Sequence, residues 1–295
     1  MNVSLKQLNV FVAITQHRTL SSASKSLFLT KAAVSLSLGE LEKQLGHTLF
    51  DRVNNRLVIN QQGRLLLPLA DEIINRANNI NQLFSSENEL IGDLHIGASN
   101  TIGNQVAPYL LSQFREATGH LNQTLIIANT EKIGQKLVDF ELDVGLIEGE
   151  LKETRLNTTP WFSDNMVIIA SPKHPLATRQ NLTLNELERS AWLLREPGSG
   201  TREYFTKHLA AHLINWEESF ELNTTEAIIN ATSANLGLAC LSQLSVQSAL
   251  KDGRVVCLDF PLTTKRDYWL IIHNEKYQSP LVKKFVEFCL EYQAI

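Results

Sequence analysis

The stretch TKAAVSLSLGELEKQLGHTLFDRVNNRLVIN, residues 30–60, decides the fold of the N-terminal part of the chain. Its first half is amphipathic, with apolar residues at spacings of four, three and four: Val34, Leu38, Leu41 and Leu45. Such spacing predicts a helix with one buried face, capped at its start by Thr30 and ended by Gly46. The second half, LFDRVNNRLVIN, predicts two short strands joined by a turn at Asn54.

The residues before this stretch predict two more helices. Leu5, Leu8, Phe11 and Val12 follow the spacing of an amphipathic helix. A polar break follows, and Ser21 or Ser22 can cap a second, shorter helix. Helix, helix, tight turn, helix and hairpin together are the layout of a winged helix-turn-helix.

The charges of the chain are unevenly distributed. Residues 1–60 carry seven basic and three acidic side chains, a net charge of +4, whereas residues 91–295 have a net charge of −6. A basic head favours a polyanionic partner, and small residues on the outer face of the third helix would let it approach a major groove. We expect double-stranded DNA to be contacted by Thr30, Lys31, Ala32, Ser35, Leu36, Arg52 and Arg56. The alternative is a small helical bundle that uses this face for protein packing.

A long helical pattern follows the predicted hairpin. Its apolar residues recur at spacings of three and four, as in a coiled-coil seam: Leu66, Leu69, Ile73, Ala77, Ile80 and Phe84. A lone exposed helix of this length needs a partner. We expect it to pair two copies of the chain, because helix-turn-helix proteins usually read two half-sites as dimers. Packing on the C-terminal part of the same chain is the alternative.

From residue 91 onward, short apolar runs alternate with helical patterns, which predicts α/β layers with parallel strands. Ligands of such folds bind where strands end and helices begin, and three of these turns are rich in hydroxyl and N–H donors that suit a small anion. The candidate ligand-binding residues are Ser99, Asn100, Thr101, Glu148, Arg195, Ser199, Gly200, Thr201, Arg202, Thr224, Thr225 and Glu226. Any one hydroxyl alone is better explained as an ordinary helix cap, and only the three turns together favour a ligand site. The glutamates would repel a bare anion unless arginine paired with them.

Several segments resemble the LysR-type transcriptional regulators. FVAITQHRTLSSASKSLFLTKAAVSLSLGELEKQLGHTLFDR is similar to their DNA-binding head, and ASNTIGN, VDFELDVGLIEG, LLREPGSGTRE and TEAIINATSANLGLACLS are most similar to the YeiE branch of that family. The resemblance covers essentially the whole chain. It implies an α + α/β fold with a winged helix-turn-helix at 1–62, a dimerising linker helix at 63–90 and a two-lobed α/β effector domain at 91–295 that resembles type 2 periplasmic binding proteins.

The resemblance also implies how the effector domain is divided and what it does. The chain would cross between lobes near 160–162 and 265–267, so that lobe I holds about 91–161 and 267–295 and lobe II about 162–266. A small effector, an oxyanion or a carboxylate, would bind between the lobes and change how a dimer or tetramer lies on promoter DNA. Sulfur oxyanions are among the candidates, because some relatives in the family sense sulfur compounds. Two positions depart from the pattern: many members have Arg or another polar residue at Leu36, and the YeiE branch has Asn at Thr224.

Other classes of protein fit the sequence less well. The 295 residues predict about two domains with ordinary cores, and we expect a cytoplasmic protein because the sequence has no run long enough to span a bilayer and no export signal at its start. We expect no metal and no cofactor, because the three cysteines form no CxxC pair and His208 and His212 have no evident third ligand. We expect no enzyme, because phosphate-loop and nucleophile-elbow motifs are missing from the sequence. A small-molecule sensor that acts through protein partners rather than DNA is the alternative function.

Overall fold

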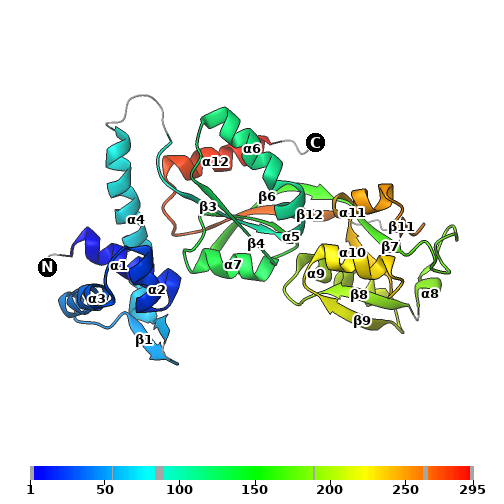
Figure 1. The fold of residues 1–295 in the computed structure, drawn as a ribbon, viewed down its shortest axis with the longest axis horizontal. Coiled ribbons are helices and arrows are strands. Elements are labelled where there is room, and N and C mark those ends of the chain that lie inside the picture. Colours follow the sequence, from blue (N-terminus) through cyan, green and yellow to red (C-terminus); the bar gives the residue numbers. More distant parts are fainter. Residues whose placement is uncertain (1–2, 55, 84–89, 189, 262–264, 293–295) are drawn as a thin grey trace.

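The computed structural model describes residues 3–54, 56–83, 90–188, 190–261 and 265–292. Three helices and a two-stranded wing form its N-terminal head (Figure 1). The head comprises α1 (Leu5–His17), α2 (Leu20–Ser26), α3 (Lys31–Leu45), β1 (Phe50–Val53) and β2 (Arg56–Ile59). Each helix begins at a side-chain cap, because Ser4, Thr19 and Thr30 each accept a hydrogen bond from a backbone N–H three residues further on. The winged helix-turn-helix predicted from the sequence is confirmed.

The apolar stripe of α3 packs into the core of the head. Val34 and Leu41 are fully buried and Leu38 is 8% exposed, and all three belong to one cluster with residues of α1 and the wing. Gly46 ends the helix with a φ of 72°, a conformation that a residue without a Cβ adopts at little cost.

α4 (Gln61–Leu83) is the long helix that leaves the head (Figure 1). One side of its N-terminal half packs on the head through Leu67 and Ala70. A second, exposed apolar stripe runs along the helix: Leu65, Leu69, Ile73 and Ile80. At the start of the predicted seam, Leu66 is half-buried against the head core, whereas Leu65 faces solvent; the seam itself stays a prediction. Ala77 is half-buried, and Phe84 lies outside the described residues.

Lobe I is built on a five-stranded sheet in the order β4-β3-β5-β12-β6. Its strands are β3 (Leu94–Ser99), β4 (Gln123–Ala128), β5 (Val144–Glu148), β6 (Leu156–Asp164) and β12 (Arg266–His273). Its helices are α5 (Asn100–Gln105), α6 (Ala107–Thr118), α7 (Thr130–Val138) and α12 (Pro280–Glu291). β3 runs parallel to β4 and β5, whereas β12 is antiparallel to β5 and β6. Separate apolar clusters on α6 with α12 and on α7 cover the sheet.

Lobe II contains two small sheets, β10-β7-β11 and β8-β9. Its strands are β7 (Met166–Ala170), β8 (Ala191–Arg195), β9 (Glu217–Leu222), β10 (Ala239–Ser242) and β11 (Val256–Cys257). Its helices are α8 (Leu184–Leu187), α9 (Gly200–His208), the 3-10 turn η1 (Ala210–His212), α10 (Thr225–Ser233) and α11 (Gln243–Lys251). The two sheets are linked by a parallel bridge between Trp192 and Leu238, and two separate apolar clusters form the interior of the lobe.

The chain crosses between the lobes at the ends of β6 and β12. β6 remains paired with β12 through Pro160 as far as Asp164, and β7 begins the lobe II sheet at Met166. The first crossing is therefore later than the predicted 160–162, because the strand ladder continues through those residues. The return crossing ends at Arg266, the first residue of β12.

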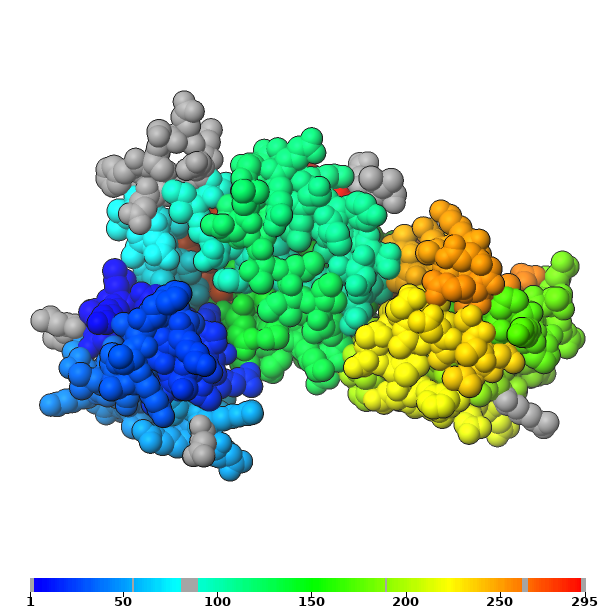
Figure 2. Space-filling view, in the orientation of Figure 1, coloured from blue at the N-terminus to red at the C-terminus, as the bar shows by residue number. Residues whose placement is uncertain are grey.

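The head docks on lobe I through the loop that follows α7. Figure 2 shows the head (blue), lobe I (mainly blue-green to green) and lobe II (lime green, yellow and orange) along the long axis of the molecule. Phe140 in this loop is 3% exposed and belongs to the core cluster of the head. Arg18, at the end of α1, pairs with Asp139 at 3.0 Å and with Glu141 at 3.8 Å. Among the described residues, none of the helices is both long and apolar enough to cross a membrane.

Candidate functional site

The outer face of α3 is free of contacts with the head core. Lys31, Ala32, Ser35 and Leu36 are all exposed, and Leu36 has 66% of its surface open to solvent. Thr30 is the N-cap, since its hydroxyl accepts from the Ala33 N–H at 3.1 Å. The face therefore offers small residues, one leucine and one lysine to a partner, which is the profile needed for close approach to a groove floor.

The wing brings two arginines next to the start of α3. Arg52 lies opposite Leu57 in the hairpin, and Arg56 lies opposite Val53. Lys31, Arg52 and Arg56 line one hollow together with Asn54 and the first residues of α2. Lys31 is 21 residues from Arg52 and 25 residues from Arg56 along the chain, yet all three line one hollow. Three cations around one hollow suit the phosphates of a nucleic acid backbone.

The sequence analysis did not single out Phe28. This residue lies in the turn between α2 and α3, has a φ of 54° and is 96% exposed. The turn therefore presents a large apolar ring to solvent two residues before the N-cap of α3. The signal in the sequence was an aromatic residue in a turn, LFLT, that otherwise needs small or polar residues.

The two lobes touch where the turn after β8 meets the end of β5. Gly200 opens α9 so close to Glu148 that a Cβ at this position would overlap the Glu148 carbonyl oxygen. Glycine is therefore required for the close approach of the lobes. The predicted turns Ser99–Thr101 and Ser199–Thr201 lie on opposite sides of this contact, at the starts of α5 and α9.

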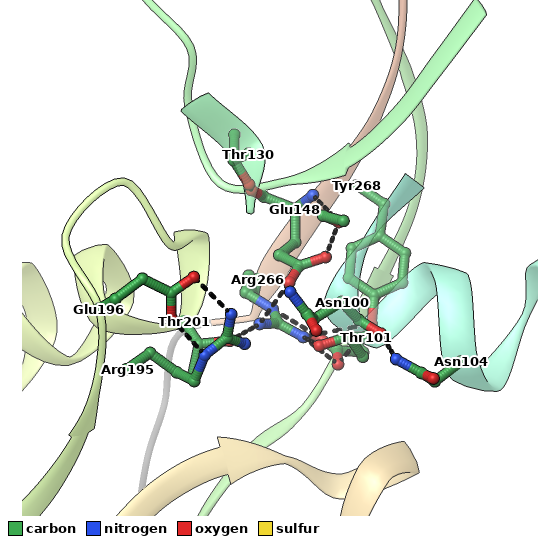
Figure 3. A network of polar contacts seen from close by, with 12 residues as sticks. Asn100, Thr101, Asn104, Thr130, Glu148, Arg195, Glu196, Thr201, Arg266 and Tyr268 are labelled. Atoms are coloured by element: carbon green, nitrogen blue, oxygen red, sulfur yellow. Dashed lines mark hydrogen bonds and ion pairs between the residues drawn. The ribbon is translucent and has the colours of Figure 1, made fainter. Parts of the chain in front are cut away.

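Arg266 joins the two turns, and Figure 3 shows it at the centre of the polar network. Its guanidinium donates to the Thr201 hydroxyl at 2.9 Å and to the Thr101 hydroxyl at 3.3 Å. Nε and Nη2 donate to the two carboxylate oxygens of Asp164 at 3.1 and 2.8 Å, so Nη2 serves both Thr101 and Asp164. Tyr268 donates to the same carboxylate at 2.7 Å. Burial favours the neutral form of Arg266, but Glu148, Tyr268 and Asp164 raise its pKa, so the guanidinium stays charged.

Glu148 forms the lobe I wall of this network. Its carboxylate accepts a short hydrogen bond from the Ser99 hydroxyl and lies 3.9 Å from Arg266, and the Glu148 side chain is 1% exposed. Its carbonyl oxygen accepts from the Thr130 hydroxyl at 2.9 Å. The Ser99 hydroxyl therefore hydrogen-bonds to Glu148 and does not cap α5, which has no side-chain cap.

Arg195 forms the lobe II wall. Its guanidinium makes a bidentate pair with Glu196 at 2.7 and 2.9 Å, and the side chain has no exposed surface. Its remaining nitrogen, Nη1, is buried and has no hydrogen-bond partner among the described residues. The Ser199 side chain is also buried and does not cap α9.

The structure places the remaining predicted residues outside this network. Arg202 donates to Glu218, Glu221 and the Arg195 carbonyl, so it holds β9 rather than facing the lobe contact. The Thr224 hydroxyl caps α10, and Glu226 pairs with Arg254 at 3.1 Å. A separate hollow along the boundary between the lobes is lined by Asn100, Asn104, Gln105, Ile127, Thr224, Thr225, Glu226, Ile229 and Ser245.

The sequence analysis missed the residues at the centre of the network. Arg266, Asp164 and Tyr268 are buried together, although 102 residues separate Arg266 from its carboxylate partner. The local signal was the charged pair Arg266-Asp267 directly before the apolar run YWLII. No group of three or more His, Cys, Asp or Glu side chains within the described ranges is arranged to hold a metal ion.

Two protein families match the chain. The family described as "Bacterial regulatory helix-turn-helix protein, lysR family" matches residues 5–64, and the "LysR substrate binding domain" family matches residues 87–294. The chain is 39% identical to the HTH-type transcriptional regulator YeiE of Escherichia coli (strain K12) over 290 residues, which cover 98% of each chain.

Solved structures share the fold. A full-length OxyR variant from Pseudomonas aeruginosa superimposes with a TM-score of 0.78 at 20% identity, covering 99% of this chain and 94% of that one. The regulatory domain of CcmR from Synechocystis, solved in complex with 2-PG, has a TM-score of 0.63 at 26% identity and covers 68% of this chain and 96% of its own. The helix-turn-helix head, the two-lobed domain and these matches lead to one conclusion: the chain belongs to the LysR family of transcriptional regulators.

Proposed function

We propose that this LysR-type regulator binds promoter DNA as a dimer or tetramer and responds to a small oxyanion or carboxylate held between its lobes. The observation that carries the effector class is Arg195 Nη1, a buried charged donor with no partner among the described residues. An unsatisfied buried donor costs roughly 1–3 kcal/mol, and more for a charged group. A ligand oxygen that accepts from this nitrogen would remove that cost.

Two hydroxyls support the same ligand chemistry. Thr101 and Thr201 accept from Arg266, so each hydroxyl proton remains available for a further acceptor. They lie on different lobes, and a ligand oxygen that bound both would stabilise one relative position of the lobes. Effector binding would then shift the population of lobe arrangements, as differential affinity requires.

The charges of the network limit the ligand. Within the described part of the chain, the cations paired with Glu148, Asp164 and Glu196 are Arg195 and Arg266. The formal net charge of these five side chains is −1, so each added negative charge on a ligand increases the repulsion. A singly charged oxyanion fits better, as does a carboxylate that also carries a hydroxyl or ammonium group.

The DNA-binding proposal rests on the head and on α4. The hollow between Lys31, Arg52 and Arg56 suits phosphates, and the exposed outer face of α3 suits the major groove. The exposed stripe from Leu65 to Ile80 favours pairing of two α4 helices, which would place two heads on two half-sites. A sensor that acts only through protein partners would leave the three cations without a role.

Calorimetric titration of the full chain tests the effector class. The panel contains sulfite, thiosulfate, acetate, a hydroxy acid and an amino acid, and the variants are Arg195→Gln and the matched control Arg202→Gln. We expect at least one oxyanion or carboxylate to bind the native protein and Arg202→Gln, and to bind Arg195→Gln at least about tenfold more weakly, a difference of about 1.4 kcal/mol. Equal binding to Arg195→Gln would contradict the assignment.

A further inference from the structure

A hollow of about 510 Å³ lies at the junction of the head, α4 and lobe I, far from the network around Arg266. Its lining comes from α1, the end of α2, α4, the segment before β3 and the loops around Phe140 and Lys276. Parts of the chain that are 267 residues apart, Asn9 and Lys276, therefore face one space. Nothing in the proposed effector response uses this hollow.

Three buried ionisable groups form one wall. The Lys276 ammonium lies 3.4 Å from an oxygen of Asp71 on α4 and 3.2 Å from an oxygen of Asp143 in lobe I. The three side chains are 6%, 8% and 12% exposed, respectively. Two carboxylates share one ammonium, so the three groups have a formal net charge of −1.

The unbalanced charge falls on Asp71. Its second carboxylate oxygen, Oδ2, is buried without a hydrogen-bond partner in the described part of the chain, whereas the second oxygen of Asp143 accepts from the His95 N–H at 2.8 Å. Lys276 has no donor to spare, because its third N–H contact is the Phe140 carbonyl at 3.4 Å. A buried carboxylate oxygen without a donor is strongly unfavourable.

The rest of the lining adds side-chain acceptors, a further carboxylate and apolar surface. The side-chain amides of Asn9 and Asn75 each donate one N–H to a backbone carbonyl, Leu5 at 3.0 Å and Asp71 at 2.9 Å, and each also carries an oxygen that can accept a hydrogen bond. Asp93 adds another carboxylate to the lining. Val12, Leu27, Ile74 and Leu281 supply apolar surface.

We propose that this hollow binds a small primary amine, with the ammonium group against Asp71 Oδ2 and the alkyl part along the apolar residues. An ammonium ion supplies the missing charge and three donors for the acceptors around it. Because the lining belongs to both the head and lobe I, an amine bound here favours the docked position of the head. This site is independent of the effector response between the lobes.

Calorimetry on the full-length protein tests the site with butylamine and 1,4-diaminobutane at neutral pH. Both amines should bind, with a dissociation constant below roughly 10 mM, and both should raise Tm. Tetramethylammonium has the same charge but no N–H donor, and butyrate has the opposite charge, so neither should bind. Equal binding of tetramethylammonium, or no amine binding at 10 mM, would overturn the proposal.

Three variants locate the site. Asp71→Asn removes the unbalanced charge and should weaken amine binding at least about tenfold. Asn75→Lys places a tethered ammonium one helical turn from Asp71, so it should raise Tm without ligand and abolish the response to amine. Glu72→Gln, the matched control on the same helix, pairs with Arg76 and lies outside the hollow, so it should bind amine like the native protein. Undiminished amine binding by either Asp71→Asn or Asn75→Lys would overturn the assignment.

Discussion

The Arg266 guanidinium donates to the Thr201 hydroxyl at 2.9 Å, and this bond ties the first residue of a lobe I strand to the first turn of a lobe II helix. Both side chains are buried, at 3% and 4% residue exposure, so the bond is not exchanged freely for one with water. The relative position of the lobes therefore depends on a few buried polar contacts, among them the Thr101 and Thr201 hydroxyls.

Thr201→Val should lower the free energy of unfolding by about 1–3 kcal/mol, because it leaves one N–H of a buried guanidinium without its acceptor. Urea denaturation followed by circular dichroism measures the change. Thr206→Val, on an exposed turn of the same helix, is the control and should change the stability by less than about 0.5 kcal/mol. Equal effects of the two substitutions would show that the bond to Arg266 contributes nothing.

Replacement of the head cations should weaken DNA binding across sequences. Arg56→Gln removes one of the three cations around the hollow next to α3, so affinity for duplex DNA should fall and the slope of log affinity against log salt should lose about one unit. Fluorescence anisotropy between about 50 and 200 mM salt measures both quantities. Lys251→Gln, exposed on lobe II, is the control and should leave the slope unchanged. A salt-independent affinity of the native protein would contradict the phosphate contacts.

Leu36→Ala should alter base preference more than overall affinity. Leu36 is the largest exposed apolar side chain on the outer face of α3, and its contact with a thymine methyl group would distinguish sequences without a hydrogen bond. Selection of binding sites from random duplexes, with the native protein and the variant, measures the preference. Identical selected sequences would show that Leu36 does not reach the bases.

Ile73→Asp should convert dimers to monomers, because it places a carboxylate in the middle of the exposed stripe of α4. Analytical ultracentrifugation measures the oligomer, and Ile73→Leu is the control that keeps the stripe apolar. Leu65→Asp should act in the same direction, since Leu65 and not Leu66 faces outward. An Ile73→Asp protein with native dimer affinity would exclude α4 as the dimer contact.

The stability of the protein should depend on the protonation of Asp71. Burial raises the pKa of its carboxyl above the ordinary value of 3.8, and Asp143 raises it further, although Lys276 opposes both. The folded protein then binds this proton more tightly than the unfolded chain. The stabilisation is full below pH 3.8 and is lost as the pH rises through the raised pKa.

Asp71→Asn should remove this loss of folding stability with rising pH. Urea unfolding at a series of pH values above 3.8 should show that the difference in stability between the variant and the native protein changes in favour of the variant as the pH rises. Lys276 and Asp143 remain in both proteins, and so do the lining residues Asp93, His17 and His95. A difference that does not change with pH would mean that Asp71 has the same pKa in the folded and unfolded states.

Local patterns in the sequence predict the elements but not their long-range partners. The stripe from Val34 to Leu41 and the cap at Thr30 predict α3 because helix packing and capping depend on neighbours within one or two turns. α4 is ambiguous at its start, since three consecutive leucines, 65–67, satisfy two different apolar faces. Only the packing of the head on one of those faces shows which leucine is exposed.

The site shows the same limit. The turns that carry the Thr101 and Thr201 hydroxyls could be predicted, because each lies where a strand is followed by a helix and this order is visible in the local sequence. Arg202 has the same local setting, yet Glu218 and Glu221 on β9 bind it and turn it away. Arg266 reaches the network only because β12 lies between β5 and β6 in the sheet, which no spacing along the chain reveals.

The most direct test of the regulator is its affinity for DNA with and without the effector. Fluorescence anisotropy would use a duplex selected by the full-length protein from random sequences, and the oxyanion or carboxylate that binds most tightly in calorimetry. We predict that the ligand changes the affinity of the native protein by at least about fivefold, the lower end of usual allosteric couplings, and leaves Arg195→Gln unchanged. Identical binding curves for the native protein with and without saturating ligand would contradict the account.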